Sequence, residues 1–266
     1  MSQTLVVKIG GGEGVNAEQI CADLIEVSRQ RPLVIVHGVS AMMAQLSAER
    51  GTNVQMLTSP SGHAFRYTNA FTRDLFMEAS ARVSRQIQAF FTAHGIGTAI
   101  IQHAISGERK TALRALVDGR VRLIRDDYSG TITRVDSCAL DQALSNGLIP
   151  IIPPLAYSET DGFLNVDGDR ASASIASALD AQTLVILSNV RGLYQNFPDE
   201  ASFISTVQQS NIDSAMNWAQ GRMKRKVLGA QEALSGGVAQ VVIADGRSSS
   251  PVTSALSGEG TVFVRS

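Results

Sequence analysis

A lysine followed by three glycines ends the first apolar segment of the chain. Lys8 stands within the apolar run from 5 to 9, and Gly10, Gly11 and Gly12 come directly after it. Glycines allow backbone N–H groups to approach an anion closely, and the lysine adds a positive charge. Because the lysine precedes the glycines, the segment is not a Walker A loop. It predicts either a phosphate-binding turn or a tight turn between a strand and a helix with a solvent-reaching lysine.

Charged residues also begin two predicted helices. Asp169 follows Gly168 at the start of a helix of small residues, where a carboxylate is the expected N-cap. Three cations, Lys224, Arg225 and Lys226, stand at the start of another helix, where the helix dipole disfavours them. This placement favours an anion site, with a solvated basic face as the alternative. A carboxylate beside phosphate-binding lysines would hold them in place.

Two more polar segments follow apolar runs. His37 and Gly38 come after the run from 33 to 36, so they share a sheet edge with Lys8, where ligands of parallel sheets bind. No acid or nucleophile accompanies His37, and a structural histidine is the simpler interpretation. Residues 188–194 follow another apolar run, and they form either the floor of a nucleotide pocket or an ordinary loop.

The spacing of apolar residues indicates the elements that must position these groups. Short apolar runs alternate with helical patterns, which is typical of a parallel sheet covered on both faces. Asn16, with Gln19 three residues later, predicts a helix start. A long amphipathic helix is expected over 69–91, and its apolar stripe is a candidate dimer face. The predicted strands cover 5–9, 33–36, 97–101, 148–152, 183–187 and 238–244.

A basic hairpin interrupts this pattern. Asp118 and Gly119 join two β-like segments, 115–117 and 120–124, and Asp-Gly favours a tight hairpin turn. The stretch from 109 to 125 has Asp118 as its single acid against six cations: Arg109, Lys110, Arg114, Arg120, Arg122 and Arg125. We expect either a solvated face or a surface that attracts an acidic partner.

Composition limits the class of protein. The chain has 266 residues, 44% of them apolar, and a net charge of −1. This suits one large α/β domain or two fused lobes and gives no sign of nucleic-acid binding. No apolar run reaches the ~18 residues of a membrane span. Cys21 and Cys138 lack metal-site spacing, so we expect buried free thiols and no metal site. A soluble cytoplasmic protein is the expectation.

Together these motifs resemble the amino acid kinase family over essentially the whole chain. Within the family the chain is similar to the LysW-aminoadipate and LysW-glutamate kinase branch, which is related to N-acetylglutamate kinase. Besides the segments above, the resemblance rests on residues 65–68, 109–111, 127–131, 165–169, 187–190, 221–226, 244–247 and 257–261.

The resemblance implies a fold and a division of labour. The fold is an open three-layer α/β/α sandwich with a mainly parallel central sheet and a β-hairpin insertion. Residues 1–177 would form an N-terminal lobe that binds the amino-acid substrate. Residues 178–266 would form a C-terminal lobe that binds ATP.

The resemblance also implies roles for individual residues. Lys8 and Lys226 would stabilise the transferring phosphoryl group, and Asp169 would orient both lysines. Arg66 would bind the α-carboxylate of the substrate, with Asn165 and the backbone of Gly38 and Val39 facing the substrate. The nucleotide would lie against Gly10, Gly11, Gly12, Ser188, Asn189, Gly192, Leu193, Tyr194 and Met223, with ATP and Mg²⁺ as cofactors.

One position departs from the family. Val39 stands where the family usually has a second glycine, close to the reacting groups. A β-branched side chain restricts the backbone, so we expect Val39 to crowd the site and to affect substrate choice.

The implied activity is ATP-dependent phosphorylation of the side-chain carboxylate of an N-blocked acidic amino acid. The substrate would be α-aminoadipate or glutamate on a small acidic LysW-like carrier protein, and the product an acyl phosphate for lysine- or arginine-type biosynthesis. N-acetylglutamate kinase acting on the free acid is the alternative. A catalytically silent sensor on the same fold is an alternative of another class. A homodimer is expected.

Overall fold

A central sheet of eight strands organises the computed structural model, which describes residues 2–12, 14–60, 62 and 64–265. In spatial order its strands are β16 (Thr206–Gln208), β18 (Thr261–Val264), β17 (Gln240–Asp245), β13 (Ala181–Ser188), β1 (Ser2–Ile9), β2 (Leu33–His37), β10 (Ile149–Ile152) and β5 (Thr98–Ile100). All neighbours from β17 to β5 pair in parallel, and β17 pairs with β18 in antiparallel. The predicted mainly parallel sheet is confirmed.

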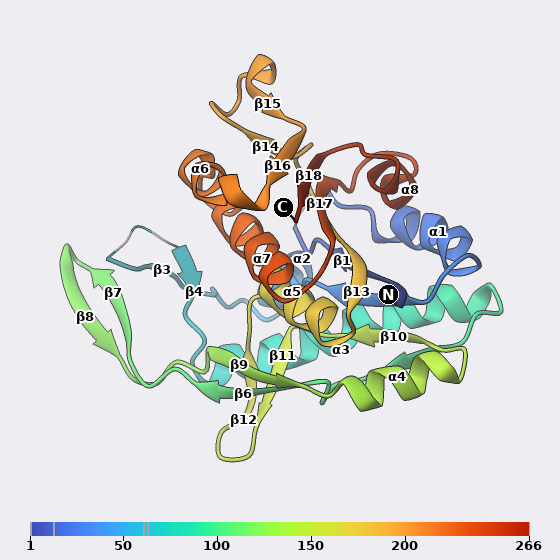
Figure 1. Cartoon of the computed structure of the whole chain (residues 1–266). Helices are drawn as coiled ribbons and strands as arrows, with labels where there is room; N and C mark the ends of the chain where they lie inside the picture. Colours follow the sequence, from blue (N-terminus) through green and yellow to red (C-terminus); the bar gives the residue numbers. More distant parts are fainter. Residues whose placement is uncertain (1, 13, 61, 63, 266) are drawn as a thin grey trace.

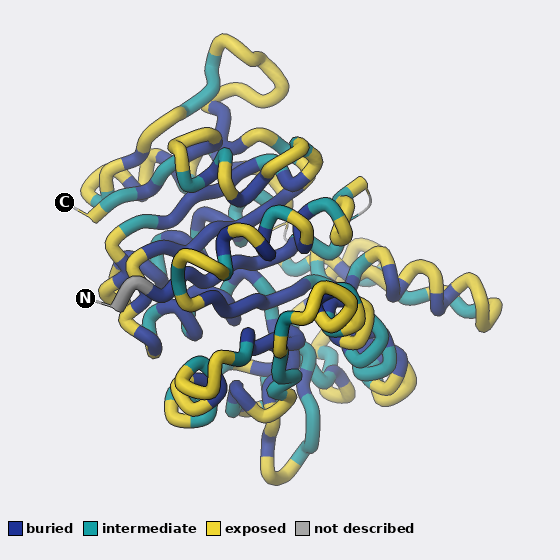
Figure 2. Tube along the Cα trace, turned by 90° about the vertical axis from the view of Figure 1, so that its right-hand side faces the viewer, coloured by how far each residue is buried: buried dark blue, intermediate teal, exposed yellow. Residues whose placement is uncertain are grey.

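Helices cover both faces of this sheet (Figure 1). Alternate residues of β1 show the two layers: Leu5 and Val7 pack with α1, α3 and α8, and Val6 packs with the helices of the other layer. The first layer contains α1 (Ala17–Ser28), α3 (Ala70–Ala93) and α8 (Pro251–Leu256), and the second contains α4 (Ser137–Ser145), α5 (Gly168–Ala178), α6 (Ile212–Trp218) and α7 (Met223–Ser235). The buried stretches gather between these layers (Figure 2). The three-layer sandwich is therefore confirmed.

Two predicted helix starts are present with their caps. The Asn16 side chain accepts a hydrogen bond from the Gln19 backbone N at 3.1 Å, and the Asn69 side chain accepts one from Thr72 N at 2.9 Å. In α3 the apolar stripe packs within the chain, where Leu75 and Phe91 are fully buried beside α2 (Ser40–Glu49) and α1. The stripe therefore belongs to the core and is not available as a dimer face.

The basic hairpin forms as expected but is part of a larger sheet. β7 (Leu113–Val117) and β8 (Arg120–Ile124) pair in antiparallel, and Asp118 and Gly119 take positive φ angles of 52° and 72°. A second, unpredicted hairpin of β3 (Met56–Thr58) and β4 (Ala64–Arg66) joins it, giving the order β4-β3-β7-β8. This sheet projects from the body of the molecule (Figure 1).

Further short strands were not predicted. A third sheet has the order β12 (Gly162–Asn165), β11 (Leu155–Ser158), β6 (Ile105–Arg109) and β9 (Gly130–Val135). Near the C-terminal half lie β14 (Leu193–Tyr194), β15 (Phe203–Ile204) and the 3₁₀ turns η1 (Glu200–Ser202) and η2 (Gln209–Asn211). Strand β12 of the third sheet comes just before α5 in the chain, so it positions the N-terminus of that helix.

The suggested division at 177/178 falls at the end of α5, and the central sheet continues across it because β1 pairs with both β2 and β13. Cys21 is buried as expected, but Cys138 is exposed on α4, so the expectation that both thiols are buried was wrong. Among the described residues, no helix is long and apolar enough to cross a membrane.

Candidate active site

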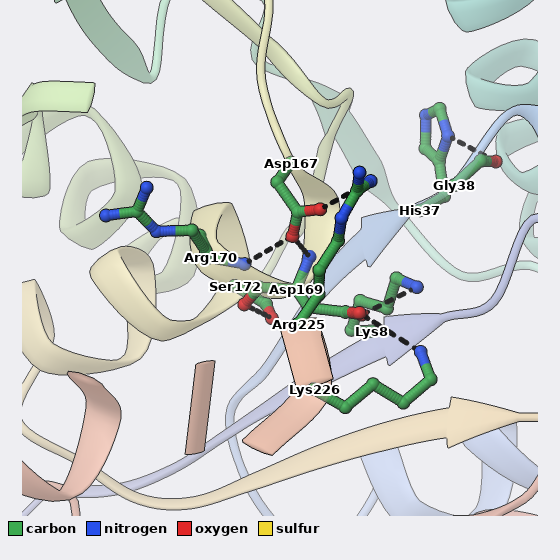
Figure 3. A network of polar contacts seen from close by, with 9 residues as sticks. All are labelled: Lys8, His37, Gly38, Asp167, Asp169, Arg170, Ser172, Arg225 and Lys226. Carbon is green, nitrogen blue, oxygen red and sulfur yellow. Dashed lines mark hydrogen bonds and ion pairs between the residues drawn. The ribbon is translucent and has the colours of Figure 1, made fainter. Parts of the chain in front are cut away.

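One lysine from a strand and one lysine from a helix meet at one buried carboxylate. Lys8 Nζ lies 2.8 Å from Asp169 Oδ1, and Lys226 Nζ lies 3.0 Å from Asp169 Oδ2. Figure 3 shows dashed lines that join this carboxylate to the side-chain nitrogens of both lysines. The three side chains are at most 10% exposed. The residues predicted to be catalytic are thus brought together, although they are far apart in sequence.

The fold explains this meeting. Lys8 is near the end of β1, Asp169 is in the first turn of α5, and Lys226 is in the first turn of α7. A Cβ atom on Gly229 would lie 3.1 Å from the Asp169 carbonyl oxygen, so glycine allows α7 to lie close to α5. This close approach delivers Lys226 to the carboxylate.

Asp169 is not the helix cap that its position suggested. The N-cap of α5 is Asp167, whose Oδ1 accepts hydrogen bonds from the backbone N of Asp169 at 3.0 Å and of Arg170 at 3.1 Å. Asp167 Oδ2 also lies 3.5 Å from Arg225 Nη1. Because Asp167 satisfies the helix terminus, the carboxylate of Asp169 is available to the lysines.

The electrostatics of the cluster favour an anion. Burial alone would raise the pKa of Asp169, but attraction to Lys226 and Lys8 and their hydrogen bonds hold that pKa well below its usual range. Burial lowers the pKa of Lys226, and attraction to Asp169 opposes this. One carboxylate between two ammonium groups leaves one positive charge in excess. A bound phosphate would offset that charge and the cost of burying it.

The glycines after Lys8 allow close backbone packing. A Cβ atom on Gly10 would lie 2.7 Å from the carbonyl oxygen of Leu187, which is backbone of β13. Gly11 lies against Gly38 in the same way. The nearest atom to a Cβ on Gly12 would be Nη1 of the Arg222 side chain, at 4.0 Å. Of the three glycines, Gly12 therefore has the most open space beside it.

A pocket opens next to the lysine pair. Lys226 belongs both to the cluster and to the wall of this pocket. The other lining residues are Ser188, Asn189, Val190, Gly192, Leu193, Tyr194, Phe197, Trp218, Gln220, Arg222 and Met223. Six of them were predicted to contact a nucleotide: Ser188, Asn189, Gly192, Leu193, Tyr194 and Met223. Phe197, Trp218 and Gln220 were missed, although Trp218 is the single tryptophan of the chain.

Thr261 fixes one wall of the pocket. Its Oγ1 accepts a hydrogen bond from Leu193 N at 2.8 Å and donates one to the Ile204 carbonyl oxygen at 2.6 Å. A Cβ atom on Gly192 would lie 2.4 Å from the same Oγ1, so glycine is needed there. The motif at 257–261 therefore supports the pocket through Thr261.

Arg66 lies at the N-terminal side of the site as a half-buried cation. Its guanidinium lies over the Phe76 ring, 5.6 Å from the ring centre. Its Nε is buried and has no hydrogen-bond partner among the described residues. Burial, followed by repulsion from Arg222 and Arg225, lowers the pKa of Arg66. A carboxylate would satisfy this donor and offset the repulsion.

Asn165 is linked to the backbone of Arg66 by a partly buried polar network. Its Nδ2 donates to Thr68 Oγ1 at 2.9 Å, and Thr68 Oγ1 donates to the Arg66 carbonyl oxygen at 3.1 Å. The buried carboxylate of Asp127 accepts hydrogen bonds from Thr68 N at 2.8 Å and from Ser129 N at 2.7 Å. Sequence reasoning placed Asp127 in a motif without a role, and the structure shows that it joins two loops of the site.

Val39 does not crowd the site with its side chain. The residue has a φ of −133°, which any residue adopts, and its side chain is buried in an apolar cluster with Met43, Leu75 and Phe76. The expectation of crowding was therefore wrong, because the core of α2 and α3 accommodates the branched side chain. Its backbone N still lies next to Gly11.

His37 is a structural histidine, as expected. It is fully buried, its Nε2 lies 2.7 Å from Ser84 Oγ, and its Nδ1 lies 3.4 Å from the Gly38 carbonyl oxygen. Burial lowers the pKa of His37 to about 4, an effect that the Gly38 carbonyl opposes and the Lys8 charge reinforces. The ring is therefore neutral near pH 7, and it links β2 to α3.

Carboxylates near the lysines already have partners. Asp167 caps α5 and faces Arg225, and Asp169 binds both lysines. In the described part of the chain, no group of three or more His, Cys, Asp or Glu side chains could hold a metal ion.

Comparison with known proteins identifies the family. The model of the amino acid kinase family matches residues 3–245. The chain belongs to the amino acid kinase family. Together with the two kinase relatives described next, this family makes the chain a phosphotransferase that uses ATP.

Individual relatives agree with this family. A LysW-aminoadipate kinase of Deinococcus radiodurans is 37% identical over 264 residues, which cover 97% of this chain and 90% of that protein. A LysW-aminoadipate kinase of Thermus thermophilus is 38% identical over 266 residues, covering 97% and 99%. A solved structure of N-acetylglutamate synthase from Neisseria gonorrhoeae matches with a TM-score of 0.82 and 25% identity, covering 99% of this chain and 60% of that one. The amino acid kinase fold is thus shared with proteins of different activity.

Proposed function

We propose that this chain transfers the γ-phosphoryl group of MgATP to the side-chain carboxylate of an N-blocked acidic amino acid. The Lys8–Asp169–Lys226 cluster beside the pocket is the observation that carries the proposal. A bond forms between a carboxylate oxygen and the γ-phosphorus, and the bond from that phosphorus to the β–γ bridging oxygen breaks. ADP leaves, and the product is an acyl phosphate. The carboxylate is already an ionised nucleophile, so no protein base is needed.

The residues around the pocket have complementary roles in this proposal. Lys8 and Lys226 offset charge on the transferring phosphoryl group, and Asp169 holds both in position. Phosphoryl transfer depends mainly on positioning and charge neutralisation, which such a cluster supplies. Mg²⁺ arrives as part of MgATP, and no protein ligand is assigned to it. The nucleotide contacts are Gly10, Gly11, Gly12, Ser188, Asn189, Gly192, Leu193, Tyr194 and Met223.

Arg66 binds the α-carboxylate of the acceptor in this proposal. Its buried, unpartnered Nε supports the assignment, because a guanidinium can bind a carboxylate with two parallel hydrogen bonds. Asn165 lies on the same network as Arg66, and the backbone of Gly38 and Val39 faces the transferred group. Residues 1–177 would thus supply the acceptor side and residues 178–266 most of the ATP side.

The acceptor is proposed to be α-aminoadipate or glutamate linked through its amino group to a small acidic carrier of the LysW type. The names of two relatives that are 37% and 38% identical support this choice over a free acetylated acid. Blocking the amino group prevents it from attacking the activated carboxyl group. The reaction would serve lysine biosynthesis or its arginine counterpart. The intact lysine cluster argues against a silent sensor.

The assembly and location of the protein are further parts of the proposal. We propose a homodimer in the cytoplasm, where the free thiols of Cys21 and Cys138 would stay reduced. Light scattering of the purified protein measures the mass directly, and a monomer mass would contradict the dimer.

One assay tests the proposed reaction. The purified protein is given MgATP with carrier-linked aminoadipate, carrier-linked glutamate or free N-acetylglutamate, and ADP release is measured. Hydroxylamine converts an acyl phosphate to a hydroxamate, which identifies the product. We expect ADP and hydroxamate with a carrier-linked acid only. Turnover confined to the free acid would favour N-acetylglutamate kinase, and no turnover with any acid would favour a sensor.

A further inference from the structure

Exposed apolar side chains gather on one face of the projecting β4-β3-β7-β8 sheet. Met56, Leu116, Val121 and Leu123 are 54%, 41%, 56% and 46% exposed. They are four of the seven exposed large apolar side chains of the described residues. Single exposed apolar residues are ordinary, but a group on one surface marks an interaction site.

The strand register puts these side chains on the same face. Leu116 on β7 lies opposite Val121 on β8 and opposite Thr58 on β3. Leu123 is two residues from Val121 on β8, and Met56 is two residues from Thr58 on β3. Directly opposite residues of antiparallel strands share a face, and so do residues two apart on one strand. We call the surface of Met56, Leu116, Val121 and Leu123 the apolar face.

The apolar face leads to the proposed acceptor site. Met56 lies opposite Arg66 in the pairing of β3 with β4, so the Arg66 side chain is on this same face. Arg120 and Arg122 lie on the other face of the hairpin, opposite Val117 and the fully buried Ala115. A molecule that lies on the apolar face is therefore beside Arg66.

We propose that the apolar face docks the carrier protein that presents the acid, an inference that rests on the proposed function. An acid joined to a protein must be presented to Arg66 from outside, so that protein contacts the surface next to Arg66. The apolar face is that surface, and it projects from the body where a second protein can reach it (Figure 1). An apolar centre with charged margins is typical of a protein interface.

Charge favours an acidic carrier over a second copy of this chain. Arg114 lies opposite Leu123, which puts it on the apolar face, and it is exposed. Arg120 and Arg122 are exposed on the opposite face of β8, and Arg125 is exposed just after this strand, so their charges lie close to the apolar face. Two copies meeting through this surface would bring these cations together, whereas an acidic partner would be attracted to them.

The test replaces the apolar side chains and keeps the charges. Val121→Ser/Leu123→Ser is compared with Val117→Ser, a matched valine on the opposite face of the same hairpin. For the double variant we expect about a tenfold higher KM for the carrier-linked acid and a similarly weaker Kd for the carrier without its acid. We expect the kcat and the KM for ATP to stay at parent values, and Val117→Ser to match the parent throughout. Val121→Thr keeps the branched shape and strand preference, and it serves if the double variant does not fold.

Each other outcome overturns the inference in a distinguishable way. If the parent protein does not phosphorylate any carrier-linked acid, the proposed function fails. If the parent does so and the double variant has unchanged KM and Kd, the docking surface lies elsewhere. A rise in KM with unchanged Kd for the carrier would mean that the face closes over the substrate. Loss of a dimer in light scattering with unchanged KM would mean that the face joins two copies of this chain.

Discussion

Gly11 and Gly38 lie so close together that a Cβ atom on Gly11 would be 2.3 Å from the carbonyl carbon of Gly38. A Cβ atom on Gly38 would likewise lie 2.5 Å from Gly11 N. The loops after β1 and β2 therefore touch through their backbones. Ala41 N donates to the Gly11 carbonyl oxygen at 2.7 Å, which ties this contact to the first turn of α2. The contact fixes the position of the two loops that flank Lys8.

Gly11→Ala should destabilise the protein more than Gly12→Ala. A methyl group at Gly11 meets backbone atoms that cannot move aside, and overpacking of this kind costs roughly 1–3 kcal/mol. At Gly12 the nearest atom is Nη1 of the Arg222 side chain, 4.0 Å from the added Cβ, so that variant is the matched control. Urea unfolding measures both free energies. Equal unfolding free energies for the two variants would show that the close contact has no energetic weight.

Lys8→Ala and Lys226→Ala should each lower kcat by about 10²–10³, which is the usual effect of losing one such electrostatic contact. Both ammonium groups lie at the Asp169 carboxylate beside the pocket. Lys224→Ala is the control, because Lys224 is a lysine of the same first turn of α7 that is not assigned to the cluster. Steady-state ADP formation gives kcat. Turnover near the parent value in either variant would remove that lysine from the mechanism.

Local signals of the sequence predicted much of the fold. The cap at Asn16 and the Asp118-Gly119 turn depend on neighbouring residues only, so they can be recognised without a structure. The central strands are equally clear, because burial on both faces leaves short apolar runs. The three-residue strand β3 is too short to show any periodicity, and its pairing with β7 depends on residues far along the chain.

The candidate site shows the same limit. Asp167 and Asp169 are two residues apart, and the sequence does not reveal which one caps α5 and which one holds the lysines. The side chain of Val39 was misjudged because its partners in the core, such as Phe76, come from α3. Phe197 and Trp218 reach the pocket from segments without a phosphate-binding pattern. Tertiary packing brings them there, and no local motif records it.

Arg66→Lys should raise the KM for the acidic acceptor by roughly tenfold and lower kcat less. A lysine keeps the charge but cannot make two parallel hydrogen bonds to a carboxylate. The unpartnered Nε at Arg66 is the donor that the change removes. Initial rates at varied acceptor and saturating ATP separate KM from kcat. An unchanged KM would show that Arg66 does not bind the α-carboxylate.

His37 should make the folded protein less stable as pH falls from about 7 toward 5. The pKa of His37 is lowered from 6.5 to about 4, so below pH 6.5 the unfolded chain binds a proton that the folded chain does not. Stability is therefore lost with falling pH, by about 2 kcal/mol between pH 7.5 and 5 for such a shift. Urea unfolding of the parent and of His37→Gln at both pH values measures the difference. The parent should lose about 2 kcal/mol more than the variant, and parallel losses would contradict the buried neutral ring.

Arg120→Glu/Arg122→Glu should raise the KM for the carrier-linked acid and weaken its dependence on salt. The two arginines lie on the opposite side of the hairpin from the apolar face, so they act through their field rather than through contact. Arg122 has one weak ionic partner, Asp118 at 3.9 Å, and both residues are exposed. Salt shortens the Debye length to about 8 Å at 0.15 M, so the parent should lose affinity for an acidic carrier as salt increases. The KM for ATP should not change.

The serine variants of the apolar face provide the contrast. The serine variant loses apolar contact with the carrier, so its KM should be raised at every salt concentration. The charge-reversed variant loses electrostatic attraction, so its KM should be raised most at low salt. KM is therefore measured for the carrier-linked acid over a salt series with both double variants. If the charge-reversed variant keeps the salt dependence of the parent, these arginines do not steer the carrier. The attraction must then come from the other cations of residues 109–125. Among these, Arg109 is already bound to Asp161 and to the backbone carbonyl groups of Asp127 and Arg125.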